Sequence, residues 1–256
     1  QEVLKNISVT ANRKMAGWLQ GHLSIAYAGR MPTATELYGF YLFNAQDGYD
    51  YLGNPSLKPE QSLQGEFRLQ AQGKKARVST TVFYHHIRNY ISGSIDPSFS
   101  TMTIGAHGVK KFSALSYAEL SGVEVSLLLK PLAALDIVST LRYTQGKDNT
   151  GDPLPMIAPL KNINTVRYQF RYFFIQGETE TAAAQNKVSH KYGEDPTPGY
   201  FLLHLRSGFP FHLMGKKTDL QYGVENLLDK NYHEHLDWGN VKRPGRNVYL
   251  MLKWFF

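Results

Sequence analysis

The chain has 256 residues, of which 42% are hydrophobic, no cysteine and a formal net charge of +7. The lack of cysteine excludes a disulfide framework, a thiolate metal site and cysteine catalysis. No run approaches the roughly 18 apolar residues that a membrane helix needs. The basic residues occur singly or in pairs at expected turns, which argues against a nucleic-acid surface. The first residues lack the features of a signal peptide, so we expect a fragment or a processed chain.

Alternating apolar and polar residues predict strands along the whole chain. In the first half we expect a polar turn at 12–14 and strands over 7–11, 18–27, 63–71, 78–84 and 123–129. Two segments with little alternation, 31–61 and 92–113, are interpreted as long loops.

The second half continues the pattern. We expect strands over 135–144, 165–171, 173–184, 201–210 and 219–225, with loops over 145–160, 185–199 and 228–245. No Gly, Pro or Asn turn signal separates 165–171 from 173–184. The turn spacing gives about eleven strands in all.

The last strand has one wholly apolar face, formed by Val248, Leu250, Leu252, Trp254 and Phe256. Its other face carries Asn247, Met251 and Lys253 among aromatic residues. A period of two with one apolar face predicts a β-strand whose apolar side contacts a protein core or lipid.

Two regularities favour lipid. Short turns alternate with loops of roughly fifteen to thirty residues, as in outer-membrane barrels. The polar faces carry Glu, Arg, Gln, Asn and His of both signs, which suits a water-filled lumen. We therefore predict an all-β fold, a transmembrane antiparallel up-and-down β-barrel. A two-sheet sandwich with a polar face towards solvent is the alternative that the pattern leaves open.

Three clusters carry a resemblance to a known family. The first contains Arg-x-Pro-Thr-x-x-Glu-Leu-Tyr and Gly-Asn-Pro-x-Leu-Lys-Pro-Glu, the second spans 83–91, and the third contains Asn-Leu-x-Asp-Lys-x-Tyr followed by Pro-Gly-Arg and a terminal Phe. Together they resemble TonB-dependent outer-membrane receptors, although Leu228 stands where Phe is usual. The motif residues, which we expect to serve folding rather than ligand binding, are Arg30, Pro32, Glu36, Asn54, Pro55, Glu60, Asn226, Asp229, Pro244, Gly245 and Phe256.

The resemblance implies a multi-pass receptor of the Gram-negative outer membrane that takes up a scarce nutrient. A ferric siderophore or other metal chelate is the first expectation, and copper, haem or cobalamin are alternatives within the family. Residues 1–256 would form the carboxy-terminal part of the barrel domain, about half of 22 strands, with the plug and TonB box absent. Implied partners are the TonB complex, the chelate, lipid, and the barrel-assembly machinery through the last strand; no cofactor and no nucleic acid are expected. A passive porin or a structural outer-membrane barrel is the alternative function.

Catalytic and metal signatures are weak. The sequence holds no Gly-x-Ser-x-Gly, His-Glu-x-x-His or phosphate-binding loop, so we expect no enzyme. External loops offer aromatic, thioether and imidazole groups that suit a chelate or soft metal. The ligand candidates are Tyr41, Tyr49, Tyr51, Met102 and His107, with His233 and His235 as metal candidates. The alternative for the aromatic residues is an interfacial girdle.

Overall fold

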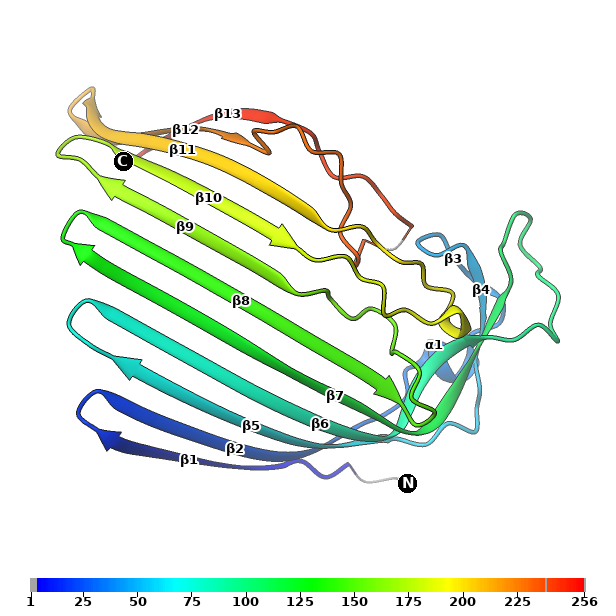
Figure 1. The fold of residues 1–256 in the computed structure, drawn as a ribbon. Helices are drawn as coiled ribbons and strands as arrows, with labels where there is room; N and C mark the ends of the chain where they lie inside the picture. The colour runs from blue at the N-terminus through cyan, green and yellow to red at the C-terminus, as the bar shows by residue number, and fades with distance from the viewer. Residues whose placement is uncertain (1–3, 238, 256) are drawn as a thin grey trace.

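A computed structural model describes residues 4–237 and 239–255, which form one large antiparallel sheet (Figure 1). Two of its 13 strands, β3 and β4, lie off the main path, which leaves the eleven strands that the turn spacing predicts. Apart from β3 and β4, strands that follow one another in the chain pair with one another, as in an up-and-down barrel. In path order they are β1 (Ile7–Ala16), β2 (Leu19–Arg30), β5 (Glu60–Gln72), β6 (Ala76–Ile95), β7 (Val109–Leu132), β8 (Leu135–Asp148), β9 (Lys161–Gln169), β10 (Phe174–Ala182), β11 (Tyr200–Leu213), β12 (Lys216–Glu225) and β13 (Asn247–Trp254).

The sheet curves into an open trough with short turns at one end and long loops at the other (Figure 1). The remaining elements gather at the loop end: α1 (Ala34–Tyr38), β3 (Leu42–Asn44), β4 (Tyr49–Leu52) and the 3-10 helix η1 (His190–Tyr192). Among the described residues, no helix is long and apolar enough to cross a membrane.

One face of the sheet is apolar although it is exposed. Cross-strand partners such as Leu23 and Phe67, or Tyr222 and Leu250, place apolar side chains side by side. Leu250 is 72% exposed. Because burying apolar surface is the main favourable term in folding, so wide an apolar face is stable only against lipid or another apolar surface.

Four uncharged polar residues interrupt this apolar face on β8, β9 and β10. Ser139 donates a hydrogen bond to Asn164 Oδ1 at 2.7 Å, and Asn164 Nδ2 donates to Thr179 at 3.3 Å; Asn162 Nδ2 donates to Ser139 at 3.4 Å. Polar groups are tolerated in an apolar medium when they satisfy one another.

The opposite face carries charge of both signs in cross-strand pairs. Arg142 contacts Glu124 at 2.7 Å, Lys161 contacts Glu180 at 2.7 Å, and Arg206 contacts Glu178 at 3.0 Å. This arrangement confirms the expected lumen-type face with paired opposite charges.

The turn expected at 12–14 is wrong. β1 runs on to Ala16, Asn12 pairs with His22, and the chain reverses at Gly17 and Trp18. The short polar run resembles a turn in sequence, but its residues are strand residues with ladder partners on β2.

The segments 31–61 and 92–113 contain more structure than expected. β6 extends to Ile95 and β7 begins at Val109, so the hairpin projects past β8, whose last residue pairs with Ala118. The first segment holds α1, β3 and β4, and β4 pairs in parallel with the start of β7. Strands that project beyond a two-faced wall need no alternation, because neither face is held against a continuous apolar layer.

The reversal between β9 and β10 falls at residues 170–173. Phe170 and Phe173 stack with ring centroids 4.4 Å apart, and Gln169 Nε2 donates to the Phe170 carbonyl at 2.9 Å. Ring stacking and a side-chain hydrogen bond thus replace the usual turn residues. Phe256 lies outside the described residues.

Candidate functional site

Arg30 closes the base of the segment that carries α1, β3 and β4. Its guanidinium contacts Glu60 at 2.6 Å and Glu36 at 2.9 Å, so one charge joins both ends of the segment. Thr33 and Glu36 form a capping box on α1. Burial alone would raise the pKa of Glu36, but the bonds from Arg30 and Thr33 outweigh it and hold the pKa below its usual value.

Three further motif residues, Pro32, Asn54 and Pro55, lie in the same segment. Asn54 donates its backbone N–H to the Glu36 carbonyl at 2.8 Å and accepts from the Ser56 backbone N–H at 3.0 Å. Pro32 is buried, whereas Pro55 is exposed. The motif therefore fixes the course of the loop.

A buried ion pair holds the β3–β4 hairpin on β7. Lys110 Nζ lies 2.8 Å from Asp47 Oδ2, and both side chains have no exposed surface. Tyr51 donates its hydroxyl to the same oxygen at 2.7 Å, and Lys110 lies 4.3 Å from the ring centroid of Tyr49. Burial and the Asp47 carboxylate raise the pKa of Tyr51, which stays neutral as a donor. The desolvated charges are stabilised by this complete set of partners.

Asp50 ties the loop between β6 and β7 to β4. Its Oδ2 accepts the backbone N–H groups of Met102 at 2.8 Å and Thr103 at 3.0 Å, and the side chain is fully buried. Burial tends to raise the pKa of Asp50, but the hydrogen bonds from Thr103 and Met102 prevail and lower it. Met102 takes part through its backbone, while the residue itself is 64% exposed.

The loop between β10 and β11 brings Glu194 and Asp195 to the same place. Tyr192, which is buried, donates its hydroxyl to Asp148 at 2.8 Å, and Glu194 Oε1 accepts the backbone N–H of Met156 at 2.7 Å. Gly193 has φ +67°, and a Cβ there would lie 3.1 Å from the Tyr49 hydroxyl. Glycine thus permits both the left-handed turn and the close approach to β4.

The loop after β12 is organised by Asn226 and Asp229. Asn226 Oδ1 accepts from the Lys230 N–H at 2.8 Å and its Nδ2 donates to the Pro244 carbonyl at 3.3 Å. Asp229 Oδ1 accepts from the Arg246 N–H at 2.8 Å. These backbone bonds close the loop at its base and direct residues 232–237 and 239–240 towards the other loops.

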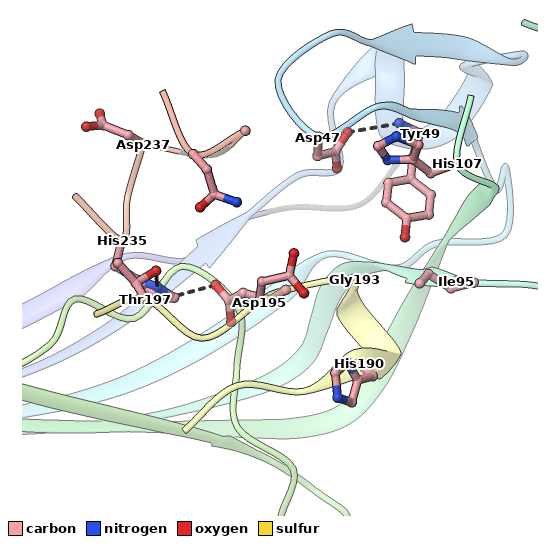
Figure 2. A pocket seen from close by; sticks show the side chains of 13 residues that line it. Asp47, Tyr49, Ile95, His107, His190, Gly193, Asp195, Thr197, His235 and Asp237 are labelled. Carbon is pink, nitrogen blue, oxygen red and sulfur yellow. Dashed lines mark hydrogen bonds and ion pairs between the residues drawn. The ribbon is translucent and has the colours of Figure 1, made fainter. Parts of the chain in front are cut away.

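The four loop segments enclose a cavity of about 460 Å³ (Figure 2). Its acidic lining consists of Asp47, Glu194, Asp195 and Asp237. Its imidazole lining consists of His107, His190 and His235. In Figure 2, Tyr49 and His107 lie at one side and His235 and Thr197 at the other, with Asp195 between them. Cavities of this size accommodate small molecules.

His235 forms a buried polar contact in the wall of the cavity. It is 8% exposed, its Nδ1 lies 2.9 Å from the Thr197 hydroxyl, and its Nε2 lies 3.1 Å from Glu194 Oε1. Because Glu194 also accepts from Met156, three loops meet at this imidazole and carboxylate.

The structure brings together three of the seven ligand and metal candidates. Tyr49, His107 and His235 line the cavity. The other four candidates lie outside its lining and are Tyr41, Tyr51, Met102 and His233. His233 Nε2 is buried without a hydrogen-bond partner in the described part of the chain. Across residues 4–237 and 239–255, no three His, Cys, Asp or Glu side chains meet in a group that could hold a metal ion.

Sequence reasoning missed the whole acidic lining. Asp47, Glu194, Asp195 and Asp237 are single charges or one pair within long loops, and His190 stands alone. No spacing rule links residues that converge from different loops. Only the length of the loops indicated that binding groups could gather there.

Comparisons with solved structures agree with this architecture. The copper transporter OprC matches 97% of this chain at a TM-score of 0.82 and 21% identity, and the match covers 39% of OprC. The siderophore receptor PirA from Acinetobacter baumannii matches 98% at 0.76 and 18% identity, covering 41% of that chain. A ferric enterobactin receptor mutant of PfeA from Pseudomonas aeruginosa matches 96% at 0.76 and 20% identity, covering 40%. The chain therefore spans about two fifths of each of these structures.

No curated protein matches the sequence. A family model described as TonB dependent receptor-like, beta-barrel matches residues 12–227, which is most of the chain. The match covers all strands of the path except the beginning of β1 and the whole of β13. The chain belongs to the TonB-dependent receptor β-barrel family, whose members are receptors and transporters of the Gram-negative outer membrane rather than enzymes.

Proposed function

We propose that this chain supplies part of the wall and outer mouth of a TonB-energised receptor for a scarce metal chelate, with a ferric siderophore as the first expectation. The observation that carries the proposal is the cavity between the long loops, placed at one end of a wall with an apolar and a charged face. Such a wall spans lipid, and such a cavity meets the ligand before it enters the lumen.

The mechanism requires no covalent chemistry. The loops capture the chelate from outside, and the charged face lines the route inward once a plug moves. Residues 1–256 then form the carboxy-terminal part of a barrel domain of about 22 strands, and both the plug and the TonB contact come from outside this chain. β1 and β13 pair with other strands of the same barrel, because an open sheet edge in lipid leaves its backbone groups unsatisfied.

The known structures with this fold support a metal-containing nutrient. They include a copper transporter and receptors for siderophores, among them ferric enterobactin. The imidazole, phenol and carboxylate groups of the cavity suit contact with such complexes.

Uptake by the receptor that carries this chain tests the proposal. It is expressed in a Gram-negative strain without its own chelate receptors, and cells are given labelled ferric siderophores, copper, haem and cobalamin. We expect saturable uptake of one ligand that disappears when TonB is depleted. Unsaturable passage that continues without TonB would instead identify a passive porin.

A further inference from the structure

We infer that the cavity selects a positively charged complex whose metal coordination shell is already filled. This inference rests on the proposed function, since it names the class of chelate that the same cavity accepts. The reasons are the sign of its charge, an unsatisfied imidazole nitrogen in its wall, and the spacing of its ligating groups.

The cavity has the opposite sign of charge from the chain. The whole sequence carries +7, yet the titratable side chains of the lining are four carboxylates, three imidazoles and one phenol, with no Lys or Arg. Two of the carboxylates form ion pairs with cations that do not line the cavity: Asp47 with Lys110 and Asp237 with Arg243. In the described part of the chain, Glu194 and Asp195 line the cavity without an ion pair to Lys or Arg, and Glu194 contacts the imidazole of His235 at 3.1 Å.

His235 provides a second and independent observation. Its side chain is 2% exposed, and its Nδ1 is engaged by Thr197. Its Nε2 faces Glu194 but has no hydrogen-bond partner among residues 4–237 and 239–255. A buried polar atom left without a hydrogen bond is unfavourable. When Nδ1–H donates to the Thr197 hydroxyl, Nε2 keeps a lone pair beside the Glu194 carboxylate, and an N–H donor of a cationic ligand would satisfy both groups.

The spacing of the ligating groups argues against capture of a bare ion. No three of the described His, Asp or Glu side chains converge on one point, so the described side chains of this cavity do not form a site that would replace the coordination shell of a metal. Carboxylates lining a cavity of about 460 Å³ can instead attract the outer surface of a complex. Cationic complexes gain from Glu194 and Asp195, whereas anionic complexes of the same size are repelled.

Two exchange-inert complexes of the same shape and opposite charge test this inference. Hexaamminecobalt(III) carries three positive charges and hexacyanocobaltate(III) carries three negative charges, and neither exchanges its ligands on the timescale of titration. Calorimetry on the complete receptor in detergent should show binding of the cation alone. The affinity should fall with added salt, as for any electrostatic contact.

Variants assign that binding to the cavity. Glu194→Gln and Asp195→Asn should each weaken binding of the cation about tenfold, or about 1.4 kcal/mol. Asp195 has no hydrogen bond within the described residues, so its isosteric change leaves the loop contacts intact. Asp152→Asn is the matched control, because this external-loop carboxylate does not line the cavity and its loss should leave binding unchanged.

Three results would overturn the inference. They are binding of the anion as tight as that of the cation, no binding of either complex, and equal binding by the control and cavity variants. TonB-dependent uptake of a metal chelate would still stand in each case, so failure of the inference is distinguishable from failure of the proposed function.

Discussion

Lys110 and Asp47 are 63 residues apart in sequence and form a fully buried pair. Removing one partner leaves an uncompensated buried charge, which lowers stability by about 3–5 kcal/mol. We expect Lys110→Met to lower the opening free energy of the β3–β4 hairpin by that amount, measured as faster native-state hydrogen exchange at β4 amides.

An exposed ion pair provides the control for that change. Lys130 contacts Asp136 at 3.0 Å with its side chain 55% exposed, and exposed pairs contribute about 0–1 kcal/mol. Lys130→Met should therefore leave exchange at β4 unchanged. Equal exchange in wild type and Lys110→Met would show that the buried pair does not hold the hairpin.

Asp50 makes the loop between β6 and β7 sensitive to acid. Its folded-state pKa lies below the ordinary value of 3.8, so its stabilising contribution is complete above pH 3.8 and is lost as the pH falls through the folded pKa. We expect protection of the Met102 and Thr103 amides, corrected for intrinsic exchange, to decline below pH 3.8. Asp50→Asn should remove this decline, and a variant that keeps it would assign the acid sensitivity to another group.

At the scale of single elements, β13 has two faces that respond differently to charge. Leu250 lies on the apolar face and Met251 on the opposite one. Arg or Lys near the bilayer midplane costs about 2–4 kcal/mol. We expect Leu250→Arg to lower the free energy of unfolding of the complete barrel by about that amount, and Met251→Arg to change it by less than about 1 kcal/mol, both measured by denaturant titration in lipid vesicles. The same loss in both variants would contradict the assignment of faces.

The main strands could be predicted because a two-sided wall imposes a period of two on the sequence. Leu63, Phe67 and Leu69 alternate with polar and charged residues because one side contacts an apolar medium and the other a lumen. Asn226 and Asp229, which we expect to serve folding, form hydrogen bonds with the backbone of residues 4 and 17 positions away.

Other features could not be read from local patterns. Beyond the wall, β6 and β7 pack against loop residues instead of separating lipid from a lumen, so residues 92–95 and 109–113 carry no alternation. The burial of Lys110 depends on a partner in a distant loop. The lining of the cavity is harder still to predict. Glu194, His235 and Tyr49 come from three distant segments of the chain, and no sequence spacing shows that they meet.

At the scale of the whole molecule, eleven strands form an incomplete wall. β1 and β13 end the path at opposite edges, and the chain spans about two fifths of the receptors that share its fold. The loops nevertheless pack together by themselves, through Asp47 with Lys110 and through His235 with Thr197. The outer mouth is thus preorganised within this part of the barrel.

The central claim, a membrane wall with a lipid face and a lumen face, is tested most directly by cysteine labelling of the complete receptor in outer membranes. The chain has no cysteine of its own, so Leu250→Cys and Phe67→Cys can be compared with Met251→Cys and Glu66→Cys. We expect the first two to react with a lipid-dissolved maleimide and the last two with a water-soluble one. Reaction of all four with the water-soluble reagent alone would contradict the account and indicate a soluble sandwich.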